Sequence, residues 1–211
     1  MVERRGPSAS ETGVAAVQCL EGEDVWAAGA AGRFDLELAR AACAAVSSVA
    51  EGAMEDFEYA EGTPPTAFII EYRDGFRGTV LMLSGFVSDF GYAARARGEA
   101  APVSCEMYSQ RPPAYDGTGE PAAGPVAHFS YLARNVEEMM VTGAPSYPIE
   151  RTLLASGMLE AALQSRRQGH ARIATPHLAV EYKREVALPP HMPKGPRPTG
   201  ATLLPWPPAK L

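Results

Sequence analysis

Alternating apolar and polar residues mark two neighbouring segments as the clearest strands of the chain. Residues 66–72 (TAFIIEY) and 78–84 (GTVLMLS) are rich in β-branched, aromatic and aliphatic side chains. Arg73, Asp74 and Gly75 between them suit a tight turn, so the pattern predicts a β-hairpin. Weaker alternation follows at residues 86–97 and 103–109. We therefore expect three or four antiparallel neighbours in one sheet, with a further strand at residues 13–20.

The longest periodic stretch, within residues 147–182, predicts an amphipathic helix followed by a short extended return. Pro148 suits the first turn, Glu150 lies at the positive end of the helix dipole, and Gly169 is a left-handed stop. A helix that is apolar on two sides is expected to pack on both, for instance between a sheet and another helix. One side carries Ile149, Leu153, Leu159 and Leu163, and the other carries Leu154, Met158, Ala161 and Ala162.

Further helical patterns occur at residues 24–30, 34–49 and 126–142, and a Pro/Gly loop is predicted at residues 110–125. Residues 1–12 read as a flexible N-terminal segment. Residues 183–211 form a proline-rich tail, expected to be disordered because proline builds neither ladders nor helix interiors. The fold class predicted for residues 13–182 is α+β, with a mostly antiparallel open sheet covered on one face by helices.

Composition removes several classes of function. A length of 211 residues allows one domain with a core and tails, or two small domains. A net charge of −6 argues against a nucleic-acid groove, and no apolar run is long enough to span a bilayer. The three cysteines, Cys19, Cys43 and Cys105, lack metal-site spacing and indicate reduced thiols in a cytoplasmic protein.

The motifs of common reaction centres are missing from the sequence. No G-x-G-x-x-G turn or P-loop is present, and Ser84 does not lie in a G-x-S-x-G elbow. The five carboxylates of residues 51–61 read as a solvated loop. His170 and His177 straddle a turn but lack a third metal ligand. We therefore assign no catalytic, cofactor-binding or metal-binding residue, and expect no cofactor.

The order of these elements resembles the C-terminal α+β domain of the Gfo/Idh/MocA family of NAD(P)-dependent oxidoreductases. The similarity covers roughly residues 13–182 and includes the hairpin EYRDGFRGTVLMLSG. Further residues that carry it are Pro148, Glu150, Leu153, Ala161, Ser165, Gly169 and Arg172. The strings ETGVAAVQCLEG, EYRDGFRGTVLML and YPIERTLL more closely resemble the second half of longer, uncharacterised bacterial proteins.

This resemblance implies a substrate or oligomerisation domain rather than a complete enzyme. The family's Rossmann half, its E-K-P motif and its G-x-x-x-D-x-x-x-H stretch have no counterpart in these residues, so we expect no catalysis by the chain alone. By analogy, Tyr72, Arg73 and Arg77 would face a ligand or a partner. That partner would be a second copy bound through the sheet face, or a separate Rossmann-type chain in a split NAD(P)-dependent oxidoreductase. The alternative is a stand-alone, sheet-based protein-interaction module.

Overall fold

The computed structural model describes residues 9–107, 136, 139–145 and 147–183. The chain divides into two units, residues 1–108 with 149–183 and residues 109–148 with 184–211. All helices and strands named below belong to the first unit. The predicted loop at 110–125, most of the predicted helix at 126–142 and the predicted tail lie outside the described residues. Residues 139–142 are helical, and Gly143 has a φ of 70° where that helix was predicted to close.

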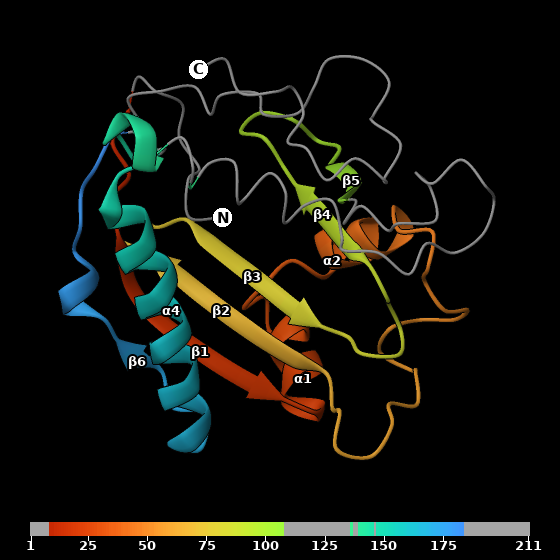
Figure 1. Cartoon of the computed structure of the whole chain (residues 1–211). Coiled ribbons are helices and arrows are strands. Elements are labelled where there is room, and N and C mark those ends of the chain that lie inside the picture. The colour runs from red at the N-terminus through yellow and green to blue at the C-terminus, as the bar shows by residue number, and fades with distance from the viewer. Residues whose placement is uncertain (1–8, 108–135, 137–138, 146, 184–211) are drawn as a thin grey trace, which may run out of the picture. The chain divides into compact units, whose positions relative to one another are not determined.

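The main sheet is antiparallel and has the strand order β3-β2-β1-β6. Its strands are β1 (Val14–Glu21), β2 (Thr66–Tyr72), β3 (Arg77–Met82) and the two-residue β6 (Ile173–Ala174) (Figure 1). In the register, Val17 faces Ile70 and Phe68 faces Val80. The predicted hairpin is confirmed, and β2 begins and ends at the predicted residues.

The prediction of one continuous sheet is wrong for the two later strands. β4 (Phe90–Ala94) and β5 (Val103–Met107) pair only with each other among the described strands. Leu83 and Phe86 are buried in a cluster with Met54, which takes the chain away from the edge of β3 before β4 begins. β4 then packs on α2 (Leu36–Ala44) so closely that a Cβ at Gly91 would overlap the Ala42 carbonyl.

The predicted α+β class is confirmed, but helices pack on both faces of the main sheet rather than on one. On one face, Val25 and Ala28 of α1 (Glu23–Ala30) pack with Leu20 and Ile69. Helix α2 follows, and the Asp35 side chain caps it by accepting hydrogen bonds from the amides of residues 37 and 38 at 2.9 and 3.2 Å. The helical pattern of residues 34–49 predicted a longer helix than the observed α2, which runs from Leu36 to Ala44.

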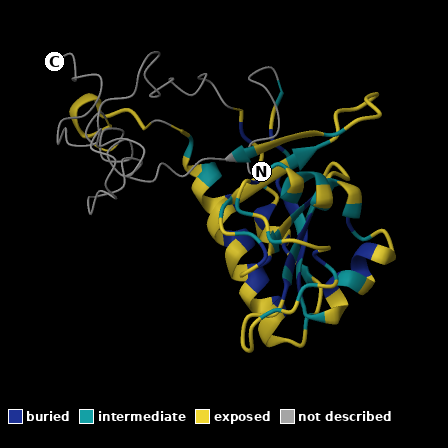
Figure 2. Ribbon diagram, turned by 90° about the vertical axis from the view of Figure 1, so that its right-hand side faces the viewer, coloured by how far each residue is buried: buried dark blue, intermediate teal, exposed yellow. Residues whose placement is uncertain are grey.

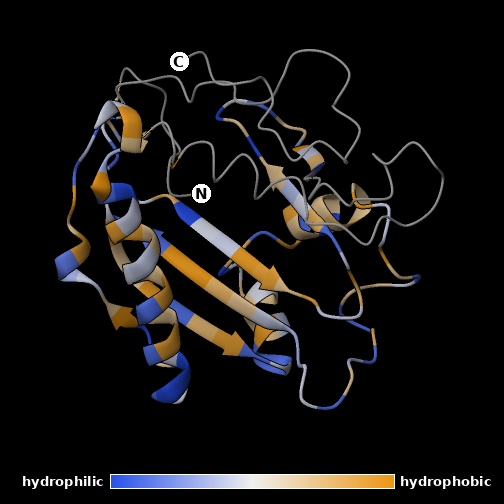
Figure 3. Ribbon diagram, in the orientation of Figure 1, coloured by the Kyte–Doolittle hydropathy of each residue, from blue (hydrophilic) through white to orange (hydrophobic). Residues whose placement is uncertain are grey.

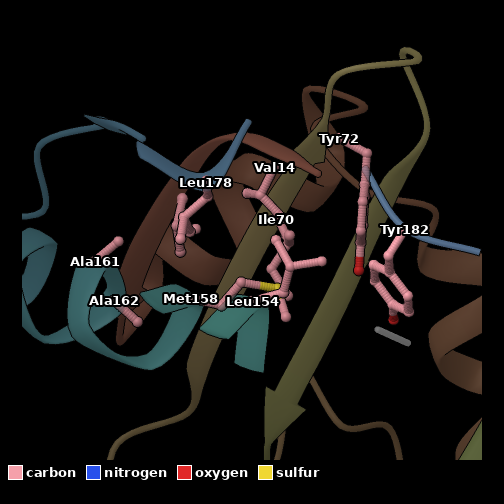
Figure 4. Packing of buried hydrophobic residues seen from close by; sticks show 10 residues of the cluster. Val14, Ile70, Tyr72, Leu154, Met158, Ala161, Ala162, Leu178 and Tyr182 are labelled. Atoms are coloured by element: carbon pink, nitrogen blue, oxygen red, sulfur yellow. The ribbon is translucent and has the colours of Figure 1, made fainter. Parts of the chain in front are cut away.

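Helix α4 (Ile149–Arg167) covers part of the opposite face of the sheet. Leu154 and Met158 pack on Val14 and Ile70, and Figure 4 shows these side chains converging over the strands. The helix stops at Gly169, whose φ of 64° confirms the predicted left-handed stop. The chain then forms β6 and a short 3-10 turn, Pro176–Leu178.

Candidate binding surface

The α4 side of the main sheet leaves apolar side chains of β2 and β3 uncovered by any described helix. Val80 is 37% exposed and Met82 is 50% exposed, while Phe68 beside Val80 is partly buried. Side chains alternate along β3, so Leu81 instead packs toward α1 on the other face. We call Phe68, Val80 and Met82 the sheet patch. Figure 3 shows the hydrophobic middle of β2 beside the hydrophobic end of β3.

A second apolar surface lies on the side of α4 that faces away from its own sheet. Ile149, Leu153, Leu159 and Leu163, which we call the outer stripe, are between 48% and 74% exposed. The opposite side of the helix is buried against the sheet, as the side view in Figure 2 shows. The sequence predicted packing on both sides of this helix. Within the described residues, only one side is packed.

The three residues predicted to share a ligand or partner surface do not lie together. Tyr72 is 4% exposed and packs in the core with α4. Arg77 extends to the opposite face, where its guanidinium donates to the carbonyls of Gly32 and Arg33 at 3.3 and 2.7 Å. Arg73 lies exposed in the turn between β2 and β3. The hairpin register turns Tyr72 and Arg77 to opposite faces of the sheet, so the structure does not bring the three residues together as a single surface.

Residue types that often perform catalysis meet where α4 ends beside β1. Ser165 Oγ accepts a hydrogen bond from the Cys19 amide at 2.9 Å, and His170 Nδ1 lies 3.1 Å from the Cys19 carbonyl oxygen. Neither group contacts the thiol in these bonds. Burial, with Glu21 adding to it, raises the pKa of the Cys19 thiol, the opposite of what an activated nucleophile needs. The cluster therefore serves to hold the helix end on the strand.

The acidic loop of residues 51–61 and the two histidines near the end of α4 supply no cluster of metal ligands among the described residues. In the loop of residues 51–61, Glu55 forms an ion pair with Arg40 at 2.5 Å. His177 is exposed, whereas His170 is half-buried against β1. Within the described ranges, no three His, Cys, Asp or Glu residues are grouped so that they could hold a metal ion. In the same ranges, no helix combines the length and apolar character needed to cross a membrane.

A pocket of about 480 Å³ lies between α2 and the following loop. Met54 and Phe86 line it, together with Cys43 and the Arg40–Glu55 ion pair. Burial and then the charge of Glu55 raise the pKa of the Cys43 thiol, which keeps it in the less reactive protonated form. The pocket therefore offers apolar volume without an activated group. This pocket could not be predicted from the sequence, because its walls come from separate segments.

The alternation of β3 and the two-sided helix were visible in the sequence, but the exposure of both surfaces was not. No protein-family model matches the chain, and the searches of curated proteins and of solved structures found no match. The resemblance to the C-terminal domain of Gfo/Idh/MocA oxidoreductases therefore stays a prediction.

Proposed function

We propose that the chain is a pairing domain of an oxidoreductase-like protein, and that it binds a second copy of itself through the sheet patch. The observation that carries the proposal is the pair of exposed apolar side chains on β3, Val80 and Met82, beside the partly buried Phe68 of β2. Large apolar side chains gathered on one exposed face are typical of interaction sites. Self-association is the commonest way for a soluble protein to cover such a face, and twofold dimers dominate.

The oxidoreductase-like class rests on the resemblance of the sequence, and the pairing role on the sheet patch. The 211 residues contain no glycine-rich nucleotide-binding turn. We therefore expect that these residues do not bind NAD(P) by themselves. A cytoplasmic location belongs to the same proposal, in keeping with free Cys19, Cys43 and Cys105.

Light scattering after size exclusion tests the pairing role. We expect the purified chain to be a dimer and Met82→Lys to be a monomer, because a lysine ammonium in an apolar interface would lose its hydration. Thr79→Lys adds the same charge to β3 on the opposite face of the sheet and is expected to remain a dimer. A wild-type chain that stays monomeric at high concentration would contradict the proposal.

Calorimetry with NADH tests the absence of a nucleotide site separately. We expect no saturable heat of binding to the purified chain. Tight binding of NADH would show that these residues form a dinucleotide site without a glycine-rich turn, and would overturn the description of the chain as a pairing domain alone.

A further inference from the structure

Helix α4 exposes a side whose composition belongs to a packed helix. The outer stripe, Ile149, Leu153, Leu159 and Leu163, recurs at helical spacing over the whole helix. Residues spaced in this way spread over an arc of more than about 100°, the width of a helix face that packs on a core. The buried side is equally apolar, with Leu154 and Met158 in the core. The helix is therefore suited to lie between two apolar surfaces.

The main sheet offers a surface that matches one more helix. Helix α4 packs over β1 and β6, and its core cluster reaches Ile70 and the partly buried Phe68 of β2. Strand β3 lies beyond β2 in the sheet (Figure 1), and its Val80 and Met82 side chains are exposed. Two strands about 4.8 Å apart present a strip about as wide as the 10 Å diameter of a helix. The sheet patch is therefore a surface on which one more helix can pack, and the described part of this chain supplies no such helix.

We propose that the outer stripe of one copy packs on the sheet patch of a second copy, and that the second copy's outer stripe packs on the first copy's patch. This inference rests on the proposed pairing function and names what the sheet patch receives. A twofold axis that runs alongside α4 turns the two sheets face to face. Because the interface is isologous, one operation covers both apolar surfaces of both copies.

In this dimer each α4 lies between its own sheet and the sheet of the second copy. The side of the helix that the sequence predicted to be packed then has its partner. Ser156 and Glu160 interrupt the outer stripe, and both are exposed. Glu160 also accepts a hydrogen bond from Gln164 at 3.2 Å, so its carboxylate has a hydrogen-bond partner on its own helix.

A charge-exchange experiment tests this pairing directly. Met82→Lys places a cation in the sheet patch, and Leu159→Glu places an anion in the outer stripe. We expect each variant alone to be monomeric, with a dimer dissociation constant raised about a hundredfold or more, because each substitution enters the dimer twice and each should cost about tenfold. An equimolar mixture should form dimers again, because one contact is then unchanged and the other joins Lys to Glu.

Ala155→Glu is the matched control, since it adds the same charge to an exposed position of α4 outside the outer stripe. We expect it to remain dimeric. Circular dichroism confirms that each variant is folded. The reversed pair, Val80→Glu with Leu163→Lys, repeats the test at two other exposed positions and keeps it decisive if one of the first variants misfolds.

The outcomes separate this inference from the proposed function. If Met82→Lys is monomeric but Leu159→Glu stays dimeric, the sheet patch pairs without α4, and only the inference is overturned. If both variants are monomeric but their mixture does not dimerise, the patch and the outer stripe do not meet, and again the inference fails. A wild-type monomer overturns both proposals and points to another occupant, such as residues 126–142 of the same chain.

Discussion

Ser165 and Cys19 are joined by a hydrogen bond in the core, although 146 residues separate them. The Cys19 amide donates to Ser165 Oγ at 2.9 Å, and both residues are fully buried. β6 pairs with Ala16 and Val17, and no strand among the described residues pairs with the edge of β1 beyond them. Ser165 and His170 complete that edge from the end of α4, where His170 also accepts from the Gln18 side chain at 2.7 Å.

Ser165→Ala should therefore destabilise the fold. The substitution leaves the buried Cys19 amide without an acceptor, which typically costs about 1–3 kcal/mol in the free energy of unfolding. Urea denaturation followed by circular dichroism measures this loss. Ser156→Ala on the exposed side of the same helix is the control and should cost nothing, because alanine is the better helix former. Equal effects of the two substitutions would show that the hydrogen bond contributes no stability.

The elements that local pattern specifies were predictable from the sequence. β2 is bounded as predicted, because a run of aromatic and β-branched residues lies between Pro65 and the Asp74–Gly75 turn. Helix α4 was predicted to within about two residues, the usual uncertainty of a helix end. Its stop at Gly169 follows from the freedom of glycine to adopt positive φ.

Features set by contacts distant in sequence were not predictable. The separation of β4 and β5 from the main sheet depends on the burial of Phe86 with Met54 and on the close approach of Gly91 to α2. Likewise, the resemblance led us to expect Tyr72 and Arg77 on one surface. Only the pairing of Glu71 with Arg77 shows that Tyr72 faces the other way. The apolar residues of the sheet patch and of the outer stripe could be recognised in the sequence. Their exposure could not be predicted, because it depends on where α4 packs.

Gly13 occupies a position where two separate constraints exclude a side chain. Its φ is 78°, and a Cβ would overlap the Leu178 carbonyl oxygen and lie 2.8 Å from the Val180 nitrogen. Gly13→Ala should cost about 1–2 kcal/mol in backbone strain and a further 1–3 kcal/mol or so in overpacking. Gly75→Ala is the control, since Gly75 also has a positive φ of 84° but a Cβ there meets nothing within 4 Å. Thermal unfolding should show a clearly larger loss for Gly13→Ala, and similar losses would refute the steric argument.

Arg172 and Glu71 form a two-pronged ion pair beside the short strand β6. Arg172 Nε lies 3.1 Å from each carboxylate oxygen, and Nη2 lies 2.5 Å from Oε2. The hydrogen bonds from Arg172 lower the pKa of Glu71. A carboxyl whose pKa is lower in the folded state stabilises the fold above its unfolded pKa of about 4.3, and this contribution is lost as the pH falls.

Arg172→Gln should accordingly reduce stability at pH 7 by at most about 1 kcal/mol, because the pair is partly exposed. The difference should shrink as the pH falls below about 4.3, and it should vanish once Glu71 is protonated in the folded chain as well as in the unfolded one. Arg172→Lys keeps the charge without the fork and should lie between them. Urea titrations at pH 7 and at several pH values below about 4.3 measure this difference in the free energy of unfolding, and a loss that does not shrink as the pH falls would show that Arg172 acts through packing.

Tyr59 should make the fold sensitive to alkaline pH. Its hydroxyl donates to the Met54 carbonyl oxygen at 3.0 Å, and its ring lies edge-on to Phe57. Burial, with Cys43 and Glu55 adding to it, raises the pKa of Tyr59 to about 12. The unfolded chain loses this proton near pH 10. The stability that the neutral phenol contributes is therefore complete below about pH 10 and falls as the pH rises toward about 12.

Tyr59→Phe keeps the buried ring and removes the titrating group. At pH 8 the variant should be less stable than the wild type by about 1 kcal/mol, because it lacks the hydrogen bond to Met54. Between about pH 10 and 12 the wild type should lose stability through this group while the variant does not, so the difference should shrink or reverse. Urea unfolding at pH 8 and pH 11 measures both effects. If the difference is the same at both values, the Tyr59 hydroxyl releases its proton as readily in the folded protein as in the unfolded chain.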